Sequence, residues 1–251
     1  LINSFIFFNR EFNMCGIFGY VLNNKVDVYN RYILNQMLAI HNDKRGGDSW
    51  GSFELNTGKV NKGIGKLYGK KNSRANGFFH TRKATDGAVN LVNSHPFKQG
   101  NIIGCHNGIV SNHELLNRLY GRNFEVDSQH IFQHLNDDLD LQEIEMYGSI
   151  VYYDIRNPKT IYFGRFDGEL SVGQVDGGIV FNSTLSGLEE SVEMAELGKL
   201  KLFPVEDGVV YKIQCGKVYN TKKRLNFSDF FYQSYYGFDE LFLPDYKSLT
   251  R

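Results

Sequence analysis

The sequence predicts an α+β fold in which two antiparallel sheets pack face to face and helices cover the outside. Short apolar segments of strand length outnumber the amphipathic helical segments, and many of them follow one another along the chain. Consecutive strands favour antiparallel pairing, whereas a parallel sheet needs a long crossover between neighbours. With 251 residues, of which 41% are hydrophobic, the chain is long enough to bury the core of one such domain.

The first predicted elements are a strand and a helix. Residues 15–22 form an apolar run of strand length, and residues 28–41 carry one apolar stripe at helical spacing. Asp27 stands directly before this stripe, where an aspartate can cap the N-terminus of a helix. The side chains of the stripe are Ile33, Met37 and Ile40. We therefore expect a strand over 15–22 that leads into a helix over 28–41.

A β-hairpin is predicted next. Residues 51–55 and 60–64 flank Asn56-Thr57-Gly58, and an Asn/Gly-containing connection of this length is typical of hairpins. Further strands are expected at six apolar segments, namely 77–82, 101–106, 149–155, 160–166, 178–183 and 208–214.

Three more helices are expected between these strands. Ser111 and Glu114 have the spacing of a capping box, in which each side chain hydrogen-bonds to the backbone amide of the other residue. Asp127 or Ser128 can cap a second helix. Residues 187–197 alternate acidic and apolar side chains at helical spacing and predict a third helix.

Charge and cysteine content bear on partners and location. The 28 basic residues balance 28 acidic residues and are scattered along the chain, so we expect no nucleic-acid partner. The three cysteines are far apart and odd in number, which argues against a disulfide framework and favours a cytoplasmic protein. No apolar run has the length of a membrane span, so no membrane partner is expected.

Two terminal segments flank the predicted domain, which comprises residues 15–225. Residues 1–14 contain a short apolar run without a preceding basic residue and do not resemble a signal peptide. We interpret them as a removable leader or a gene-model extension, with a genuine N-terminal extension as the alternative. Residues 226–251 form an aromatic-rich tail, expected either to pack on the domain or to dock elsewhere.

Cys15 directly follows Met14, a possible translation start. If the mature chain begins at Cys15, this residue carries a thiol nucleophile together with a free α-amine. An α-amine has a pKa of roughly 7.7–8.0 and can serve as a base near neutral pH. The alternative is an ordinary cysteine in a core strand, since cysteine is among the most buried residue types.

Five short segments carry residues suited to amide chemistry. They are 14–19, 45–49, 80–87, 106–108 and 127–128, with Asn93-Ser94-His95-Pro96 between the third and the fourth. Together and in this order they resemble the glutaminase domain of class II glutamine amidotransferases, which are N-terminal nucleophile hydrolases. The resemblance covers roughly residues 14–135. It implies a four-layer αββα sandwich built from two antiparallel sheets.

The resemblance also implies a mechanism. Cys15 would attack the side-chain amide of glutamine, with its own α-amine as the base, and form a γ-glutamyl thioester. Asn107 and the backbone N–H of Gly108 match the oxyanion hole of the family, which stabilises the tetrahedral intermediate. Taken alone, these two residues would be read as an Asn-Gly turn after a strand. No cofactor is implied.

Four residues match the glutamine-binding positions of the family. Arg82 would bind the α-carboxylate with its planar guanidinium, and Asp127 would accept hydrogen bonds from the ammonium group. Thr85 and Gly87 would add hydroxyl and backbone contacts. Taken singly, Arg82 would equally suit a surface ion pair and Asp127 a helix cap.

Supporting roles are implied for three further residues. Arg45 and Asp48 match a segment that packs beside the nucleophile, and His95 belongs to a His-Pro motif. For His95 we expect a structural hydrogen-bonding role rather than acid–base catalysis, because the α-amine already serves as the base. Lys83 and Asp86 depart from the residues common in the family, which predicts a difference in how the substrate loop closes.

His130 and His134 are one helical turn apart, which is the spacing of a zinc-binding pair. Ile131 stands where the zinc motif has glutamate, and no third ligand is evident. We therefore expect two partly exposed helix histidines and no metal site.

The chain carries no signature of a sugar-isomerase, phosphoribosyltransferase or ATP-pyrophosphatase domain. The sequence thus predicts a stand-alone glutaminase domain that releases ammonia or passes it to a separate synthase subunit. Two alternatives remain open. One is a hydrolase of another γ-glutamyl compound or small amide, and the other is a non-catalytic regulatory or binding module with the same fold.

Overall fold

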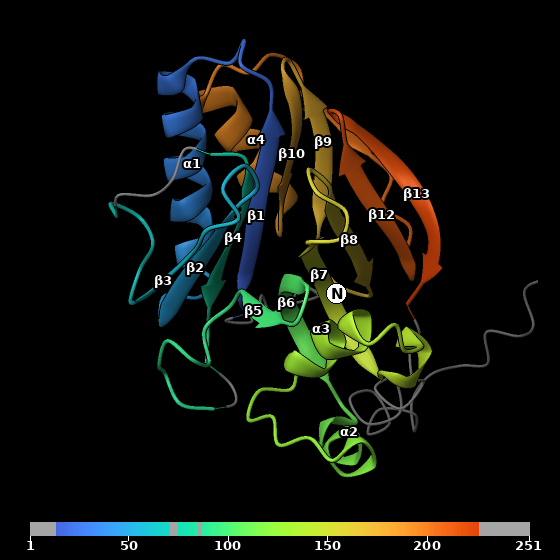
Figure 1. Cartoon of the computed structure of the whole chain (residues 1–251). Helices are drawn as coiled ribbons and strands as arrows, with labels where there is room; N and C mark the ends of the chain where they lie inside the picture. Colours follow the sequence, from blue (N-terminus) through green and yellow to red (C-terminus); the bar gives the residue numbers. More distant parts are fainter. Residues whose placement is uncertain (1–13, 71–74, 85–86, 226–251) are drawn as a thin grey trace, which may run out of the picture.

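The computed structural model describes residues 14–70, 75–84 and 87–225. Two antiparallel sheets lie face to face, and helices cover the outer face of each (Figure 1). The predicted four-layer αββα sandwich is therefore confirmed. Most of the predicted N-terminal segment and the predicted C-terminal tail lie outside the described residues. Within these ranges no helix is both long and apolar enough to cross a membrane.

The first sheet has seven strands in the order β11-β9-β10-β1-β4-β2-β3. Its strands are β1 (Gly16–Leu22), β2 (Ser49–Glu54), β3 (Val60–Ile64), β4 (Gly77–Arg82), β9 (Ser171–Val175), β10 (Gly178–Asn182) and β11 (Lys201–Phe203). β1 lies between β4 and β10 near the centre of this sheet, and it pairs with both of them in antiparallel register.

The second sheet has six strands in the order β13-β12-β8-β7-β6-β5. Its strands are β5 (Phe97–Gln99), β6 (Ile102–Val110), β7 (Met146–Asp154), β8 (Ile161–Phe166), β12 (Val209–Gln214) and β13 (Lys217–Arg224). β6 and β7 pair without a break from Ile102–Asp154 to Val110–Met146.

The helices form the two outer layers. On the first sheet they are α1 (Val28–Asp43) and α4 (Leu185–Met194); beside the second sheet they are α2 (His113–Tyr120), α3 (Gln129–Asn136) and the short 3₁₀ helix η1 (Leu141–Glu143). In Figure 1, α1 and α4 lie together against the sheet that contains β1, while α2 and α3 lie at the opposite end of the view.

Three hydrophobic cores correspond to the three contacts between layers. Ile17 belongs to the core between the sheets, and its neighbour Phe18 belongs to the core beneath α1 and α4. A third core, which includes Phe132 of α3 and Ile150 of β7, lies on the outer face of the second sheet. Successive side chains of a strand point to opposite faces, so a strand that is covered on both faces reads as a continuous apolar run. β1 is such a strand.

Most of the predicted elements are present. The hairpin forms from β2 and β3, and α1 is capped as predicted, because Asp27 Oδ1 accepts from the amides of Tyr29 at 2.7 Å and Asn30 at 2.9 Å. Four strands were not predicted, namely β5, β9, β11 and β13. β5 and β11 have only three residues each, and β13 is largely exposed and rich in lysine, so their apolar signal is weak.

The predicted capping box is wrong. Ser111 still belongs to the strand pairing, because its amide donates to Glu145 O at 2.9 Å and its hydroxyl lies 3.0 Å from Glu145 Oε2. Asn112 occupies the N-cap position of α2 without a side-chain capping bond. Similarly, Ser128 stands at the N-cap of α3, but neither its side chain nor that of Asp127 caps this helix.

Candidate active site

Cys15 immediately precedes β1, at the edge where β4 ends. The register pairs Gly16 with Thr81, which brings Cys15 next to the residues that follow β4. Its sulfur accepts a hydrogen bond from the amide of Lys83 at 3.3 Å and lies 3.5 Å from Lys83 O. Arg45 Nε donates to Cys15 O at 3.1 Å. Arg45 thus lies beside the candidate nucleophile, as predicted.

The environment of the Cys15 thiol favours its neutral form. Burial raises the pKa of Cys15 to about 11, against the opposing effects of the Lys83 amide and of the charges of Arg82 and Arg45. The charge of Asp127 raises the pKa further. Three of the predicted polar residues are therefore close enough to act on this sulfur. At neutral pH the thiol needs a base before it can act as a nucleophile.

Gly16 allows α1 to approach β1 closely. A Cβ at this position would lie 2.2 Å from Asn42 Oδ1. Asn42 is buried near the end of α1 and donates to Asn182 Oδ1 at 2.7 Å, while its carbonyl accepts from Thr81 Oγ1 at 2.8 Å. Asn42 and Asn182 therefore tie α1 to β4 and β10 beneath Cys15. Sequence analysis identified neither residue.

Ser183 connects the two sheets beside Cys15. Its hydroxyl accepts from the amide of Ile17 at 2.8 Å and donates to Ile17 O at 3.2 Å. Asn107 Nδ2 donates to the same hydroxyl at 3.5 Å. Asn107 lies on β6 of the second sheet and Ile17 on β1 of the first. The predicted oxyanion residue is thus held next to the strand that follows Cys15, and sequence analysis missed the serine that connects them.

Asn107 and Gly108 lie within β6 rather than in a turn. Gly108 pairs with Gly148 of β7, and a Cβ on Gly108 would lie 1.8 Å from Tyr147 O and 2.7 Å from Gly148 Cα. A Cβ on Gly148 would lie 2.1 Å from Asn107 O. The two backbones approach so closely that only glycine fits at either position.

Asp127 is fixed to β6 through one carboxylate oxygen, and its other oxygen bonds the next residue in the chain. Oδ2 accepts from the amide of Val110 at 2.6 Å, and Oδ1 accepts from the amide of Ser128 at 2.6 Å. His106 of β6 lies on the same side, with Nδ1 2.9 Å from Ser128 Oγ and its Nε2–H donating to Tyr147 O at 3.1 Å. The rigid β6 strand therefore carries Asn107 and Gly108 and also positions Asp127.

Arg82 ends β4 and is 4% exposed. Its Nη1 donates to Ala88 O at 3.2 Å, so the side chain contacts the loop that follows β4. The charge of Arg82 also lowers the pKa of Cys15 against the effect of burial.

The described part of the substrate loop is held at two points. Asp48 Oδ2 accepts from the amide of Ala84 at 3.0 Å and lies 3.5 Å from Lys83 Nζ. Lys83, which departs from the family pattern, is thus the ion-pair partner of the predicted supporting residue Asp48. Farther along, Asn93 donates to Ala88 O at 3.2 Å and to Glu125 Oε1 at 2.9 Å.

Gly87 has a φ of +72°, and a Cβ on it would lie 3.0 Å from Asn93 Nδ2. A side chain at this position would be strained and would crowd the Asn93 contact. Thr85 and Asp86 lie outside the described residues. Asn93 and Glu125 were not identified from the sequence as residues that hold this loop.

The expected hydrogen-bonding role of His95 is wrong. Neither ring nitrogen has a hydrogen-bond partner among the described residues. Instead the ring packs 4.2 Å from the His80 ring and 4.4 Å from the Phe97 ring, measured between centroids. Burial lowers the pKa of His95 well below its usual value and that of His80 to about 3. Both rings are therefore neutral at physiological pH, and the Nε2–H of His80 donates to His106 O at 3.2 Å.

His130 and His134 are buried, and the prediction of partly exposed histidines is wrong. Arg122 Nη1 lies 3.3 Å from His130 Nδ1 and 2.9 Å from His134 Nδ1. Burial lowers the pKa of both rings, with the charge of Arg122 as a further cause. Among the described residues, no cluster of three or more His, Cys, Asp or Glu side chains could hold a metal ion.

Comparison with known proteins gives the following relatives. The chain is 29% identical over 234 residues to glutamine-fructose-6-phosphate aminotransferase (isomerizing) of Pyrobaculum aerophilum, covering 82% of this chain and 37% of the relative. The protein of that name from Geobacillus kaustophilus is 28% identical over 211 residues, covering 73% and 34%. That from Zymomonas mobilis is 35% identical over 139 residues, covering 50% and 22%.

The relatives from Pyrobaculum aerophilum and Geobacillus kaustophilus match most of this chain. The chain spans only about a third of the length of each of them. A solved glutamine aminotransferase class-II domain protein from Silicibacter pomeroyi matches with a TM-score of 0.43 and 11% identity, covering 85% of this chain and 99% of that one. No protein-family model matches the sequence. The resemblance that the motifs predicted is confirmed by the curated relatives: the chain is similar to the glutaminase domain of class II glutamine amidotransferases.

Proposed function

We propose that the protein hydrolyses the side-chain amide of glutamine to glutamate and ammonia, with Cys15 as the nucleophile. The observation that carries this proposal is the position of the Cys15 sulfur, which accepts from the amide of Lys83 at 3.3 Å directly after Arg82, the last residue of β4. The approach of Asn107 to the strand that follows Cys15, through Ser183, supports it. The similarity to glutamine-fructose-6-phosphate aminotransferases supports an enzyme of the glutamine amidotransferase class.

The proposed reaction begins with removal of the chain before Cys15. In the described structure Cys15 N belongs to the peptide bond with Met14, and an amide nitrogen is not basic. Once it is freed, the α-amine takes the thiol proton, and the thiolate attacks the amide carbon of glutamine. The carbonyl oxygen becomes an oxyanion, for which Asn107 Nδ2 and the Gly108 amide are the proposed donors.

The intermediate then collapses to a thioester. The C–N bond breaks, the leaving nitrogen takes the proton from the α-ammonium group, and ammonia departs, leaving the γ-glutamyl group on Cys15. A water molecule attacks the thioester carbon with the same amine as the base. The C–S bond breaks, glutamate leaves, and the thiol is restored with its proton.

Recognition of glutamine is assigned to the groups around the sulfur. Arg82 would pair with the α-carboxylate, because a guanidinium matches the two oxygens of a carboxylate. The carboxylate of Asp127, which the amides of Val110 and Ser128 fix in place, would accept from the α-ammonium group. Thr85 and Gly87 complete the proposed set.

Ammonia is proposed to pass to a synthase in a separate subunit. The matched segment covers about a third of the length of the curated relatives. The fructose-6-phosphate chemistry that their name describes is therefore a property of the full-length relatives. The three described cysteines are unpaired, which supports the proposed cytoplasmic location.

Two measurements test the proposal. Intact-mass analysis of protein isolated from its native host should give a chain that begins at Cys15. Ammonia release from glutamine should occur with this processed chain and be lost in Cys15→Ala. The control is Cys105→Ala, which removes a buried thiol from the core between the sheets. Activity that survives Cys15→Ala would overturn the role of Cys15.

The substrate is tested separately. Glutamine should be hydrolysed faster than simple amides, because these lack the α-carboxylate and ammonium groups. It should also be hydrolysed faster than γ-glutamyl anilide, which keeps both groups but carries an aromatic ring on the amide nitrogen. Preference for a simple amide would support the alternative hydrolase, and inactivity of the processed chain towards all amides would support the non-catalytic module.

A further inference from the structure

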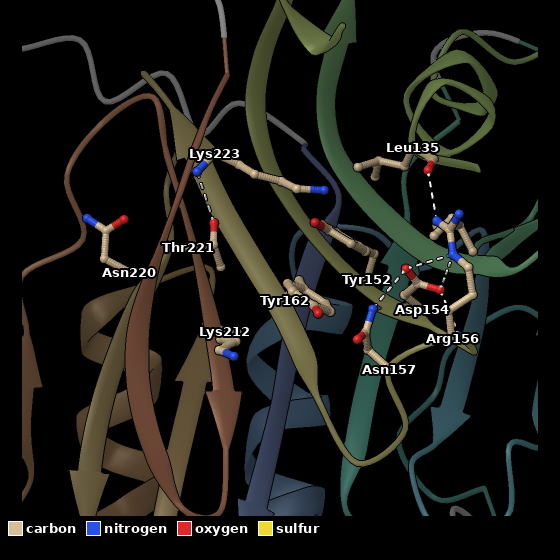
Figure 2. Close-up of a pocket in the computed structure, with 11 residues that line it drawn as sticks. Leu135, Tyr152, Asp154, Arg156, Asn157, Tyr162, Lys212, Asn220, Thr221 and Lys223 are labelled. Atoms are coloured by element: carbon tan, nitrogen blue, oxygen red, sulfur yellow. Dashed lines mark hydrogen bonds and ion pairs between the residues drawn. The ribbon is translucent and has the colours of Figure 1, made fainter. Parts of the chain in front are cut away.

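A hollow of about 330 Å³ lies on the outer face of the second sheet. It is bordered by β7, β8, β12 and β13 and by the end of α3, and none of its lining residues belongs to the candidate active site (Figure 2). A cavity of this size can hold a small-molecule ligand. The hollow is lined by polar and cationic side chains together with two tyrosines.

An irregularity of β13 directs two residues into this hollow. The pairing with β12 passes from Tyr211–Asn220 to Val209–Arg224, so that the three residues 221–223 oppose only one residue of β12. Lys222, in the middle of this bulge, has a φ of +64°. Such a bulge bends the strand and redirects its side chains, and a lysine in the left-handed region is strained.

The bulge is held by its own hydrogen bonds. The hydroxyl of Thr221 donates to Val210 O at 2.6 Å and accepts from the amide of Lys223 at 3.2 Å. The amide of Lys222 donates to Asn220 Oδ1 at 2.7 Å. Thr221 and Lys223 line the hollow as a result, and Figure 2 shows the Lys223 side chain extending across it towards Tyr152.

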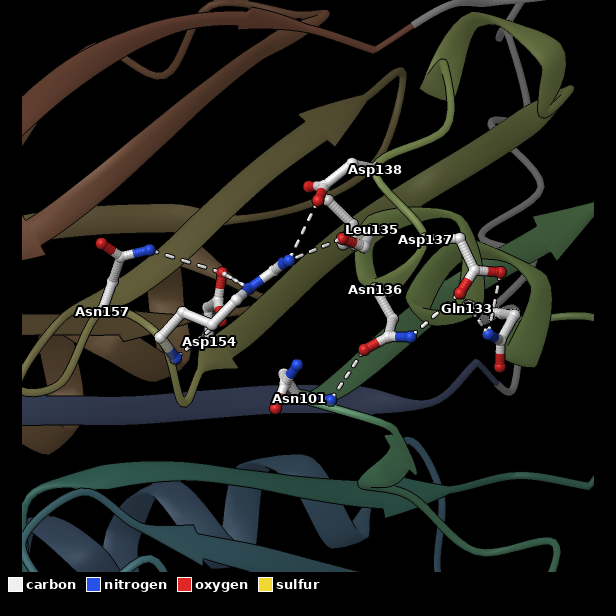
Figure 3. A network of polar contacts seen from close by, with 9 residues as sticks. Asn101, Gln133, Leu135, Asn136, Asp137, Asp138, Asp154 and Asn157 are labelled. Atoms are coloured by element: carbon white, nitrogen blue, oxygen red, sulfur yellow. Dashed lines mark hydrogen bonds and ion pairs between the residues drawn. The ribbon is translucent and has the colours of Figure 1, made fainter.

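The hollow has more positive than negative charge. Lys212 and Lys223 line it, and neither forms an ion pair with a carboxylate in the part of the chain that the structure describes. The one carboxylate of the lining, Asp154, lies 2.9 Å from Arg156 Nε. Arg156 also pairs with Asp138 at 3.1 Å and donates to Leu135 O at 3.2 Å. Figure 3 shows Asp138, Leu135 and Asp154 in this network. Lys212 Nζ lies 5.8 Å from the centroid of the Tyr219 ring, so the charges of the two lysines are not neutralised by a carboxylate among the described residues.

Two tyrosines add phenol hydroxyl groups to the lining. Tyr152 and Tyr162 pair across β7 and β8, and their rings stack with centroids 4.8 Å apart. Burial raises the pKa of both phenols, so they remain O–H donors. The oxygens of Asp154, in contrast, already accept from Arg156 and Asn157. Two lysines, two phenol donors and a single carboxylate that is already paired suit a ligand that carries anionic oxygens.

We propose that this hollow binds a small molecule that carries a phosphate group, with Lys212 and Lys223 contacting the phosphate and the Tyr152 hydroxyl as a further donor. The site lies apart from Cys15, so the proposal does not depend on glutamine hydrolysis. Free phosphate and a phosphate ester share the chemistry that these side chains recognise.

Calorimetric titration of the full chain at constant ionic strength tests the proposal. The probes are inorganic phosphate, ribose 5-phosphate and AMP, with ribose as the uncharged control. We expect saturable binding of at least one phosphate-bearing probe and none of ribose. Tighter binding of ribose 5-phosphate or AMP than of phosphate identifies an ester as the ligand, while equal affinities identify the free anion. Absence of binding by all three probes would overturn the proposal.

Charge variants locate the bound probe. Lys212→Gln and Lys223→Gln should each weaken binding roughly tenfold, as expected for the loss of one charged hydrogen bond. Lys217→Gln, an exposed lysine of β13 outside the hollow, should bind as the unaltered protein does. Thermal unfolding of each variant checks its fold independently of any activity. Unchanged affinity in both hollow variants would refute this site.

Discussion

Asn107 Nδ2 donates to the hydroxyl of Ser183 at 3.5 Å, and this contact joins the second sheet to the first directly beside Cys15. The same hydroxyl bonds both backbone groups of Ile17. Ser183 therefore positions the proposed oxyanion donor relative to the strand that carries the proposed nucleophile. A small displacement between these groups would reduce stabilisation of the transition state far more than it would affect substrate binding.

Ser183→Ala should lower kcat for ammonia release roughly tenfold with little change in KM. The amide of Ile17 loses its partner, so the free energy of unfolding should also fall by about 1–3 kcal/mol. The measurements are steady-state kinetics of the processed chain and urea unfolding. Ser191→Ala is the matched control, because Ser191 is a buried serine whose hydroxyl donates to Gly187 O within α4. Equal kcat values for the two variants would contradict the positioning role.

Gly108→Ala should destabilise the fold by about 3 kcal/mol or more, because its Cβ would lie 1.8 Å from Tyr147 O. The neighbouring backbone of Gly148 leaves no room for relaxation. Urea unfolding or, where the variant fails to fold, soluble yield measures the effect. Gly47→Ala is the control, because the nearest atom to its Cβ, at 3.3 Å, belongs to the flexible side chain of Lys66. Similar unfolding midpoints for both variants would refute the close approach of β6 and β7.

Arg82→Lys should raise KM for glutamine roughly tenfold to a hundredfold, because lysine retains the charge but cannot pair with both carboxylate oxygens. 4-Aminobutanamide, which is glutamine without its α-carboxylate, separates binding from structural damage. Its turnover should be similar in the variant and the unaltered protein. The control is Arg31→Lys in α1, which changes a partly buried arginine that donates to Leu22 O and Val26 O. If both substrates lose activity equally, Arg82 does not bind the carboxylate.

Most strands could be predicted because they depend on local periodicity, whereas the four-layer αββα sandwich was predicted from the resemblance to a known family. β1 and α1 have strong apolar patterns, and Asp27 caps α1 through residues two and three positions away. The capping box failed for the opposite reason. Ser111 forms its hydrogen bonds with Glu145, which directly precedes β7, the partner strand of β6. A local motif loses its meaning when a distant strand supplies a competing partner.

Parts of the candidate site depend on contacts that no local pattern can reveal. Asn42 and Asn182 are 140 residues apart, and Ser183 and Ile17 are 166 apart. Each is an unremarkable polar residue until the layers stack and bury it, after which it needs a hydrogen-bond partner. Burial also explains the errors for His95 and the two α3 histidines, since helical spacing and motif identity do not tell whether a histidine faces solvent.

The stacked pair His80 and His95 should make stability depend on pH. Burial lowers the pKa of both rings from the usual 6.5, to about 3 for His80. The unfolded chain therefore binds more protons than the folded protein below pH 6.5. By linkage, stability is complete above this pH and is lost as the pH falls, by about 1.4 kcal/mol per pH unit for each buried neutral histidine.

His95→Phe should flatten this dependence. Neither ring nitrogen of His95 has a partner among the described residues, so phenylalanine removes no hydrogen bond and retains the ring contacts with His80 and Phe97. Urea unfolding at pH 7.5 should give free energies within about 1.5 kcal/mol for the variant and the unaltered protein, as for a shape-conserving core substitution. Between pH 6 and pH 5 the unaltered protein should lose more stability than the variant, by about 1 kcal/mol. Parallel pH profiles would show that His95 is not buried as a neutral ring, because the substitution then removes no group whose proton affinity changes on folding.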